Sequence, residues 1–394
     1  MTAESIPITK TSEEEFQTEE VLTIAGGHFT HDIYTASVAP LLPVIIEKLS
    51  LSLTAAGSLT AILQFPALIN PFIGYLADRV SLRYFIILAP AVTATLISSM
   101  GFVDSYYGLA LLFFITGISV AVFHAPAPAM IGRISGEQVG KGMSFFMAGG
   151  ELARSVGPIL AVWAVSLWTL DGFYRIVVLG WIASLILFWR LRSVPARPNK
   201  RGDLRSILPV LSTVFLPLLI IVFFRNFLLV SLTTYLPTFM KSGGASLWVA
   251  GIALAILELA GVAGALSSGT LSDRVGRKPI LLVAFVFSAV FMLIFLNVEG
   301  WVMVPVLLVL GFSTLSTAPV MMAIVQDHLP NNRAVGNGLF LSMTFLIRPI
   351  AILAIGYVGD LYGLQTAFYL SAFVSMLAIP AIFALPAQGN IPKS

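Results

Sequence analysis

The chain has 394 residues, of which 58% are hydrophobic and only 10% carry a charge. Soluble domains carry about 25% charged residues, so this composition excludes a soluble enzyme and a nucleic-acid-binding protein. The same apolar content excludes intrinsic disorder. The net charge is only +3, and the lack of cysteine excludes disulfide scaffolds and thiolate metal sites.

Long apolar segments follow one another along the whole chain, and each is bounded by charged residues, Gly or Pro. A helix needs roughly 20 apolar residues to cross a bilayer. Twelve such spans are predicted, near residues 21–46, 53–77, 84–103, 107–130, 141–164, 172–191, 208–236, 248–270, 279–297, 301–325, 334–357 and 363–385. A transmembrane barrel would instead show alternating segments of ~10 residues. The predicted fold class is therefore an all-α membrane protein.

Basic residues predict the topology. The even-numbered turns and the middle loop hold fourteen Lys and Arg residues, whereas the odd-numbered turns hold three, which places both termini in the cytoplasm. The predicted parts are an acidic tail (1–20), a six-helix bundle (21–191), a basic cytoplasmic loop (192–207), a second six-helix bundle (208–385) and a cytoplasmic tail (386–394). We expect a multi-pass protein of a prokaryotic inner membrane, because long, continuously apolar segments form helical bundles rather than outer-membrane barrels. The acidic tail is neither a signal peptide nor a transit peptide.

The two halves of the chain repeat each other. The segment GYLADRVSLR begins at Gly74 and GTLSDRVGRK begins at Gly269, 195 residues later. A second pair, Arg154 in the fifth span and Arg348 in the eleventh, is 194 residues apart. Two matches at nearly one offset indicate an internal repeat of two six-helix units.

These paired segments resemble the signature of the major facilitator superfamily. The first copy departs from it at Ser81 and Leu82, where a Gly and a basic residue are usual. Finer segments, such as HFTHDIYTASVAPLLPVI and GKGMSFFMAGGELARSVGP, are similar to the branch of fosmidomycin-resistance-type exporters. The resemblance implies alternating access by rocking of the halves. It also implies conformational-switch loops that hold the outward-facing state, although a purely topological anchor is the alternative; their residues are Gly74, Asp78, Arg79, Arg83, Gly269, Asp273, Arg274, Gly276, Arg277 and Lys278.

Six charged residues fall near the middle of predicted spans, where charge is costly and indicates function. Three are acids and three are bases: Asp32, Glu151, Glu258, Arg154, Arg225 and Arg348. In the family that the chain resembles, the third, sixth, ninth and twelfth helices face lipid. None of these six residues lies on those helices. The pattern therefore predicts a charged central cavity.

His28, His31 and Asp32 share one face of the first helix, because they are spaced at i, i+3 and i+4. Imidazole and carboxylate groups can exchange a proton near neutral pH, so we predict a proton-coupling site, to which Glu151 and Glu258 are added. A metal site at His28, His31 and Asp32 and a structural hydrogen-bond cluster remain alternatives.

The cations are expected to bind substrate anions or to compensate charge. Arg154 and Arg348 would face each other across the cavity, although Glu151 and Arg154 could instead be a self-neutralising pair. Arg225 has no acid on its own helix, so Asp32 is its expected partner. Further candidates for the substrate cavity are His124, Tyr34 and Asn226.

The predicted function is secondary active transport, most specifically proton-coupled efflux of small amphipathic or anionic organic compounds such as antibiotics. Uptake or uniport of an organic anion, sugar or divalent metal ion is the alternative. No nucleotide-binding loop and no zinc-protease motif occurs, so neither an enzyme nor a cofactor is expected. The expected partners are a small-molecule substrate, protons and membrane lipid, and the chain is expected to act as a monomer.

Overall fold

The computed structural model describes residues 16–70, 72–73, 82–136, 138–192, 210–329 and 333–386. Every regular element within these ranges is helical. Eleven helical segments are long and apolar enough to cross a membrane, and Leu53–Ile69 is a shorter apolar helix. The prediction of an all-α membrane protein is confirmed, with the described part of the second predicted span forming the shorter helix.

Eight α-helices of the N-terminal half lie within the described ranges. They are α1 (Thr18–Ala36), α2 (Val38–Leu49), α3 (Leu53–Gln64), α5 (Arg83–Ser98), α6 (Tyr106–His124), α7 (Pro126–Ile134), α8 (Val139–Trp168) and α9 (Val177–Leu191). Short 3-10 helices extend three of them, namely η1 (Phe65–Ile69), η2 (Ser99–Phe102) and η3 (Asp171–Ile176).

The C-terminal half supplies the remaining described helices. They are α11 (Leu216–Val230), α12 (Leu236–Ser242), α13 (Leu247–Val275), α14 (Arg277–Phe295), α15 (Met303–His328), α16 (Arg333–Tyr362), α17 (Leu364–Met376) and α18 (Ile379–Ala384). Two π-helical turns, Leu211–Phe215 and Ser231–Tyr235, flank α11, and a 3-10 turn, Gly300–Val302, precedes α15.

Prolines interrupt two spans that the sequence predicts as continuous. The first span changes from α1 to α2 at Ser37, three residues before Pro40. The fourth changes from α6 to α7 at Ala125, directly before Pro126. Proline has no N–H to donate and its ring clashes with the carbonyl four residues earlier, which explains both breaks.

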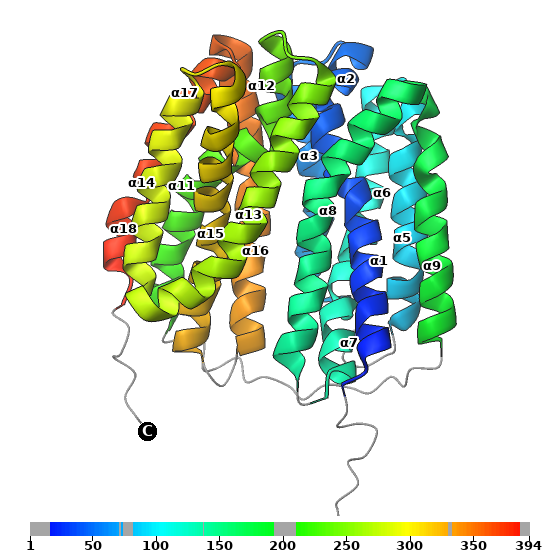
Figure 1. Ribbon diagram of the computed structural model, residues 1–394, viewed down its shortest axis with the longest axis horizontal. Helices are drawn as coiled ribbons and strands as arrows, with labels where there is room; N and C mark the ends of the chain where they lie inside the picture. The colour runs from blue at the N-terminus through cyan, green and yellow to red at the C-terminus, as the bar shows by residue number, and fades with distance from the viewer. Residues whose placement is uncertain are drawn as a thin grey trace, which may run out of the picture.

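The two halves form two helix groups that stand side by side (Figure 1). α8 contacts α13 and α3 contacts α16 across the junction between them. Two apolar core clusters lie inside the N-terminal half and one inside the C-terminal half. A fourth cluster joins Leu42 and Ala56 of the N-terminal half to the C-terminal core, so the halves share part of their core.

Polar contacts also join the halves, at the end of the bundle opposite the start of α1 (Figure 1). The Asp360 carboxylate at the end of α16 accepts hydrogen bonds from the backbone N–H groups of Leu53 (2.6 Å) and Thr54 (2.9 Å) and from the Thr54 hydroxyl (2.5 Å). Tyr235 donates its hydroxyl to the Ile352 carbonyl (3.0 Å) beside the same helix start. We call the contact between Asp360 and the start of α3 the gate contact.

Candidate functional site

Asp32 of α1 is surrounded by three histidines. Its carboxylate oxygens lie 3.1 Å from His28 Nε2, 2.9 Å from His31 Nδ1 and 3.5 Å from His124 Nε2. His28, His31 and Asp32 meet as their spacing predicts. His124, expected only as a substrate residue, joins them because α6 packs against the same region and ends there.

Aromatic rings and glycines position this cluster. The His28 ring stacks on Phe146 at 4.0 Å and the His31 ring on Phe123 at 4.5 Å. A Cβ on Gly150 of α8 would lie 2.6 Å from the His28 ring. The paired glycines of the GGELARSVGP segment therefore allow α8 to approach α1 closely enough to enclose the imidazole.

The hydrogen bonds of the cluster fix where its protons can lie. His28 Nδ1 lies 2.7 Å from the Phe146 carbonyl and His124 Nδ1 lies 3.0 Å from the Val120 carbonyl. A carbonyl oxygen only accepts, so both Nδ1 atoms carry protons. In the neutral rings the two Nε2 lone pairs then face each other at 3.1 Å, beside the Asp32 carboxylate. Three acceptors cannot lie together without a donor, so this geometry requires at least one additional proton among them.

A chain of hydroxyl groups extends the cluster into the N-terminal half. His31 Nε2 lies 3.0 Å from Thr93 Oγ1, and Thr93 donates to Ser119 Oγ at 2.8 Å. Sequence reasoning missed Thr93 and Ser119, because single hydroxyl residues in apolar helices give no signal of their own. Their matches in the second half, Ser288 and Ser313, are likewise hydrogen-bonded, at 3.1 Å.

An ion cluster crosses from one half to the other. Arg154 of α8 pairs with Glu151 on its own helix, and its Nε lies 3.6 Å from Glu258 Oε2 of α13. The Arg154 side chain is 45% exposed, whereas that of Glu258 is 7% exposed. A mid-span guanidinium this exposed, between two acids of opposite halves, borders the space between them.

Arg348 of α16 also lies near this region but has a different environment. Its Nη2 donates to Thr233 Oγ1 at 3.1 Å, and its buried Nε has no hydrogen-bond partner. No Asp or Glu oxygen of the described residues lies within 4.0 Å of it, whereas Arg154 has two. The expected pair of equivalent arginines is therefore asymmetric.

The expected pairing of Arg225 with Asp32 is wrong. Arg225 donates to the Thr317 hydroxyl (2.5 Å) and the Thr314 carbonyl (3.3 Å) of α15, while Asp32 lies among histidines. Arg225 and Asp32 therefore each contact residues of their own bundle rather than each other.

Two further candidates have structural roles in this fold. Tyr34 is fully buried; its hydroxyl donates to the Ile176 carbonyl (2.6 Å) and accepts from the Gly180 N–H (3.0 Å). Asn226 is also fully buried and donates to the Val222 carbonyl at 2.7 Å. Both side chains are enclosed by protein in this structure, and their role in binding substrate stays a prediction.

The second switch loop connects helices of the C-terminal half to one another. Arg277 pairs with Asp273 (2.6 Å) and Asp327 (3.1 Å), Lys278 donates to the Phe383 carbonyl (3.0 Å), and Arg274 is exposed. Of the other switch candidates, Gly74, Asp78 and Arg79 lie outside the described residues.

The two glycines of this loop, Gly276 and Gly269, differ in their surroundings. Gly276 has φ +104°, a conformation that favours glycine. A Cβ on Gly269 would meet nothing within 4 Å, so this glycine does not mark a close contact between helices. Arg83 of the first loop begins α5 and lies over the Tyr84 ring, 5.3 Å from its centroid.

Three groups of the histidine cluster would also suit a metal ion. Ligand atoms of His28, Asp32 and His124 lie within 4.8 Å of one another. Two imidazoles and one carboxylate are acceptable ligands for divalent transition metals. The set expected from sequence had His31 in place of His124, but the His31 nitrogens face Asp32 and Thr93.

Comparisons with known proteins agree with this geometry. A sequence profile of the Major Facilitator Superfamily matches residues 24–296 and 259–393. The chain is 24% identical over 370 residues to the fosmidomycin resistance protein of Escherichia coli (strain K12), covering 91% of each chain. It is 23% identical over 332 residues to the sialic acid transporter NanX of the same organism, covering 80% and 81%.

Solved transporters share the fold. A bacterial homolog of the human lysosomal transporter Spinster, in an inward-facing and occupied conformation, superposes with a TM-score of 0.80 at 16% identity, covering 93% of this chain and 96% of that one. A D-xylose–proton symporter gives 0.75 at 18% identity, covering 94% and 97%.

Proposed function

Because the chain belongs to the Major Facilitator Superfamily and is a multi-pass membrane transporter rather than an enzyme, we propose that it exports small amphipathic or anionic organic compounds in exchange for protons. The observation that carries this proposal is the convergence of His28, His124 and Asp32 as three hydrogen-bond acceptors. We place the protein in a prokaryotic inner membrane, as a monomer with both termini in the cytoplasm.

The proton is bound and released within the Asp32 cluster. With the proton, His28 or His124 donates to Asp32, and the cluster is a set of satisfied hydrogen bonds. Without it, two lone pairs and a carboxylate repel one another at about 3 Å, which disfavours this arrangement. Loss of the proton therefore drives a rearrangement of α1 against α6, and α1 also packs on α8.

The ion cluster of Arg154, Glu151 and Glu258 couples this rearrangement to substrate binding. Arg154 lies on α8, which encloses His28, and pairs with Glu258 of the opposite half. A substrate anion at Arg154 or Arg348 would compete with Glu258 for the guanidinium groups. Glu151 and Glu258 can then take or release protons as Arg154 changes partner, which links anion binding to the relative position of the halves. The switch loops, with Asp78 and Asp273, stabilise the outward-facing state in this scheme.

The relatives agree on neither substrate nor direction. One is named for fosmidomycin resistance, which fits export, and another for sialic acid transport. Uptake or uniport of an organic anion or sugar is the second candidate. Divalent-metal transport is a third, and it is favoured by the three ligand atoms at His28, Asp32 and His124.

Reconstituted protein tests the proposal. In proteoliposomes with an imposed pH gradient, we expect gradient-driven transport of fosmidomycin and other organic anions by the unmodified protein. Asp32→Asn and Glu151→Gln should abolish the dependence on the gradient while counterflow continues. Asp104→Asn, at an exposed acid that pairs with Lys48 within one half, is the control and should transport normally.

The same assay separates the alternatives. Gradient-driven transport that is unchanged in both Asp32→Asn and Glu151→Gln would refute the coupling assignment. Transport that accelerates in the direction of the proton flux would indicate uptake. Calorimetric binding of Zn²⁺ or Mn²⁺ that is lost in His124→Ala would indicate metal transport instead.

A further inference from the structure

Arg225 is a buried cation without an acidic partner. It lies on α11 inside the C-terminal half and is 6% exposed. Two of its five N–H groups donate to described residues, the Thr317 hydroxyl and the Thr314 carbonyl. Within the described ranges, no Asp or Glu oxygen lies within 4.0 Å of its nitrogens. Burying an ion costs several kcal/mol unless its charge is compensated, so this environment calls for an anion.

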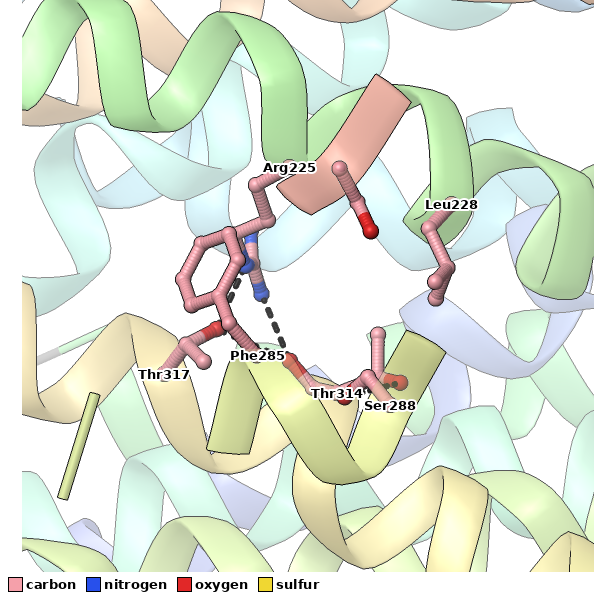
Figure 2. A pocket seen from close by; sticks show the side chains of 7 residues that line it. Arg225, Leu228, Phe285, Ser288, Thr314 and Thr317 are labelled. Atoms are coloured by element: carbon pink, nitrogen blue, oxygen red, sulfur yellow. Dashed lines mark hydrogen bonds between the residues drawn. The ribbon is translucent and has the colours of Figure 1, made fainter. Parts of the chain in front are cut away.

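The guanidinium borders a small cavity (Figure 2). The Arg225 guanidinium, two apolar side chains and four residues with hydroxyl groups line the cavity. These residues are Arg225, Leu228, Phe285, Ser288, Thr314, Thr317 and Ser375. The space inside it that is free for a small solute measures only about 10 Å³, whereas sites for drug-sized ligands measure about 300–1,000 Å³. Its lining contains no acid, so its chemistry suits a small anion and its size excludes an organic substrate.

The internal repeat identifies the charge that is missing. Arg225 and Asn226 lie 194 residues after His31 and Asp32, at the same places on the first helices of the two halves. In the N-terminal half, His31 lies 2.9 Å from the Asp32 carboxylate. In the C-terminal half a permanent cation replaces the imidazole and a neutral amide replaces the carboxylate.

A second positive charge near Arg225 adds to the positive electrostatic potential there. Among the described residues, Arg348 is the charged group close enough to act on Arg225, and it is also a cation. Arg348 in turn has no carboxylate within 4.0 Å among those residues. The C-terminal half therefore holds a buried cation, Arg225, and a partly buried one, Arg348, near each other.

We propose that this cavity binds a small inorganic anion of the size of chloride. The anion would accept hydrogen bonds from the N–H groups of Arg225 that the described residues do not use. The Ser288 and Thr314 hydroxyls, which now bond to neighbouring carbonyl or hydroxyl oxygens, can rotate toward it. The bound anion supplies the charge that Asp32 supplies in the other half, and it stabilises the C-terminal half without taking part in the transport of the organic substrate.

Thermal unfolding of the purified full-length protein tests this site. Sodium chloride or bromide is titrated against sodium gluconate at constant ionic strength, because gluconate is too large for the cavity. We expect a saturable rise in Tm with either halide, as for any ligand that binds only the folded state. Arg225→Gln should remove the halide-dependent rise.

A matched pair of serines on α17 provides the control. Ser375 lines the cavity, whereas Ser371, one turn earlier, donates to the Phe368 carbonyl and does not line it. Ser375→Val should weaken the halide effect by filling the cavity, and Ser371→Val should retain it. Because Arg225→Gln could fail to fold, anomalous scattering from bromide-soaked crystals gives a second measurement, and we expect its peak beside Arg225.

The proposal would be overturned by a Tm that does not respond saturably to halide in the unmodified protein. An equal response in Arg225→Gln, or equal weakening in the two serine variants, would also refute it, as would a bromide peak elsewhere and none in the cavity. These outcomes do not depend on proton coupling, so the site can fail or hold independently of the proposed function.

Discussion

Removing the gate contact should shift the protein toward a state in which the end of the bundle opposite the start of α1 is open. Asp360 accepts three hydrogen bonds from Leu53 and Thr54 at the start of α3, in the other half. Asp360→Ala removes all three. α3 should remain folded, because Ser52 provides its own cap by accepting from the Ala55 N–H at 3.1 Å.

The size of this shift follows from the geometry. Loss of a helix N-cap costs about 0.5–2 kcal/mol, and the contact is exposed, so we take about 1–2 kcal/mol. The open state lacks the contact in any case, so the whole cost falls on the closed state. An energy of this size changes the ratio of the two states about 5- to 30-fold.

Distance measurements by electron spin resonance test the prediction. The chain has no cysteine, so spin labels attach only at introduced sites, here Tyr107→Cys and Trp301→Cys, two exposed positions in different halves. Asp360→Ala should enlarge the population with the longer distance, and Asp104→Ala, which removes a contact within one half, should not. Identical distance distributions in Asp360→Ala and the unmodified protein would refute the reasoning.

Three further predictions concern packing and charge. Gly57→Leu should prevent closure of the same end, because even a Cβ there would lie 2.0 Å from the Tyr235 hydroxyl; the spin-label distances would show one long population. Tyr34→Phe should lower the stability by about 1–3 kcal/mol, since the Ile176 carbonyl and Gly180 N–H lose their partner, while pH-gradient-driven transport continues; thermal unfolding and the transport assay measure the two effects. Glu258→Gln should reduce gradient-driven transport about tenfold, equivalent to about 1.4 kcal/mol, because it removes the ion pair between the halves; unchanged transport would exclude that pair from coupling.

The sequence predicted the class of fold because the bilayer imposes a simple rule on segment length and polarity. It located the mid-span charges for the same reason, since charged residues are rare in apolar helices. It could not predict which of them meet. His124 joins Asp32 only because α6 breaks before Pro126 and places the imidazole beside α1, and a periodic pattern within one helix contains no such information.

The error at Arg225 has a similar origin. The sequence suggested that it pairs with Asp32, because Arg225 has no acid on its own helix and Asp32 lies on the symmetry-related first helix of the other half. The fold instead directs each residue into its own bundle, where His31 and Thr317 are nearer than the other half. The 194-residue repeat contained the better clue, since it aligns Arg225 with His31 and Asn226 with Asp32.

The glycine-rich segment of α8 shows what sequence reasoning leaves open. Its small residues are compatible with helix packing or with a transport motif. In the structure Gly149 and Gly150 lie against Ala25 and His28, so close helix packing and the enclosure of the His28 imidazole are one feature. Such a result requires the register between two helices, which tertiary packing decides.

The central claim is that the Asp32 cluster takes up and releases the coupling proton. Proteoliposomes adsorbed on a solid-supported membrane and exposed to a sudden change of pH report this directly, because proton binding moves charge without any substrate. We expect a transient current in the unmodified protein and in Asp104→Asn, and none in Asp32→Asn. A current in Asp32→Asn equal to that of the unmodified protein would contradict the account.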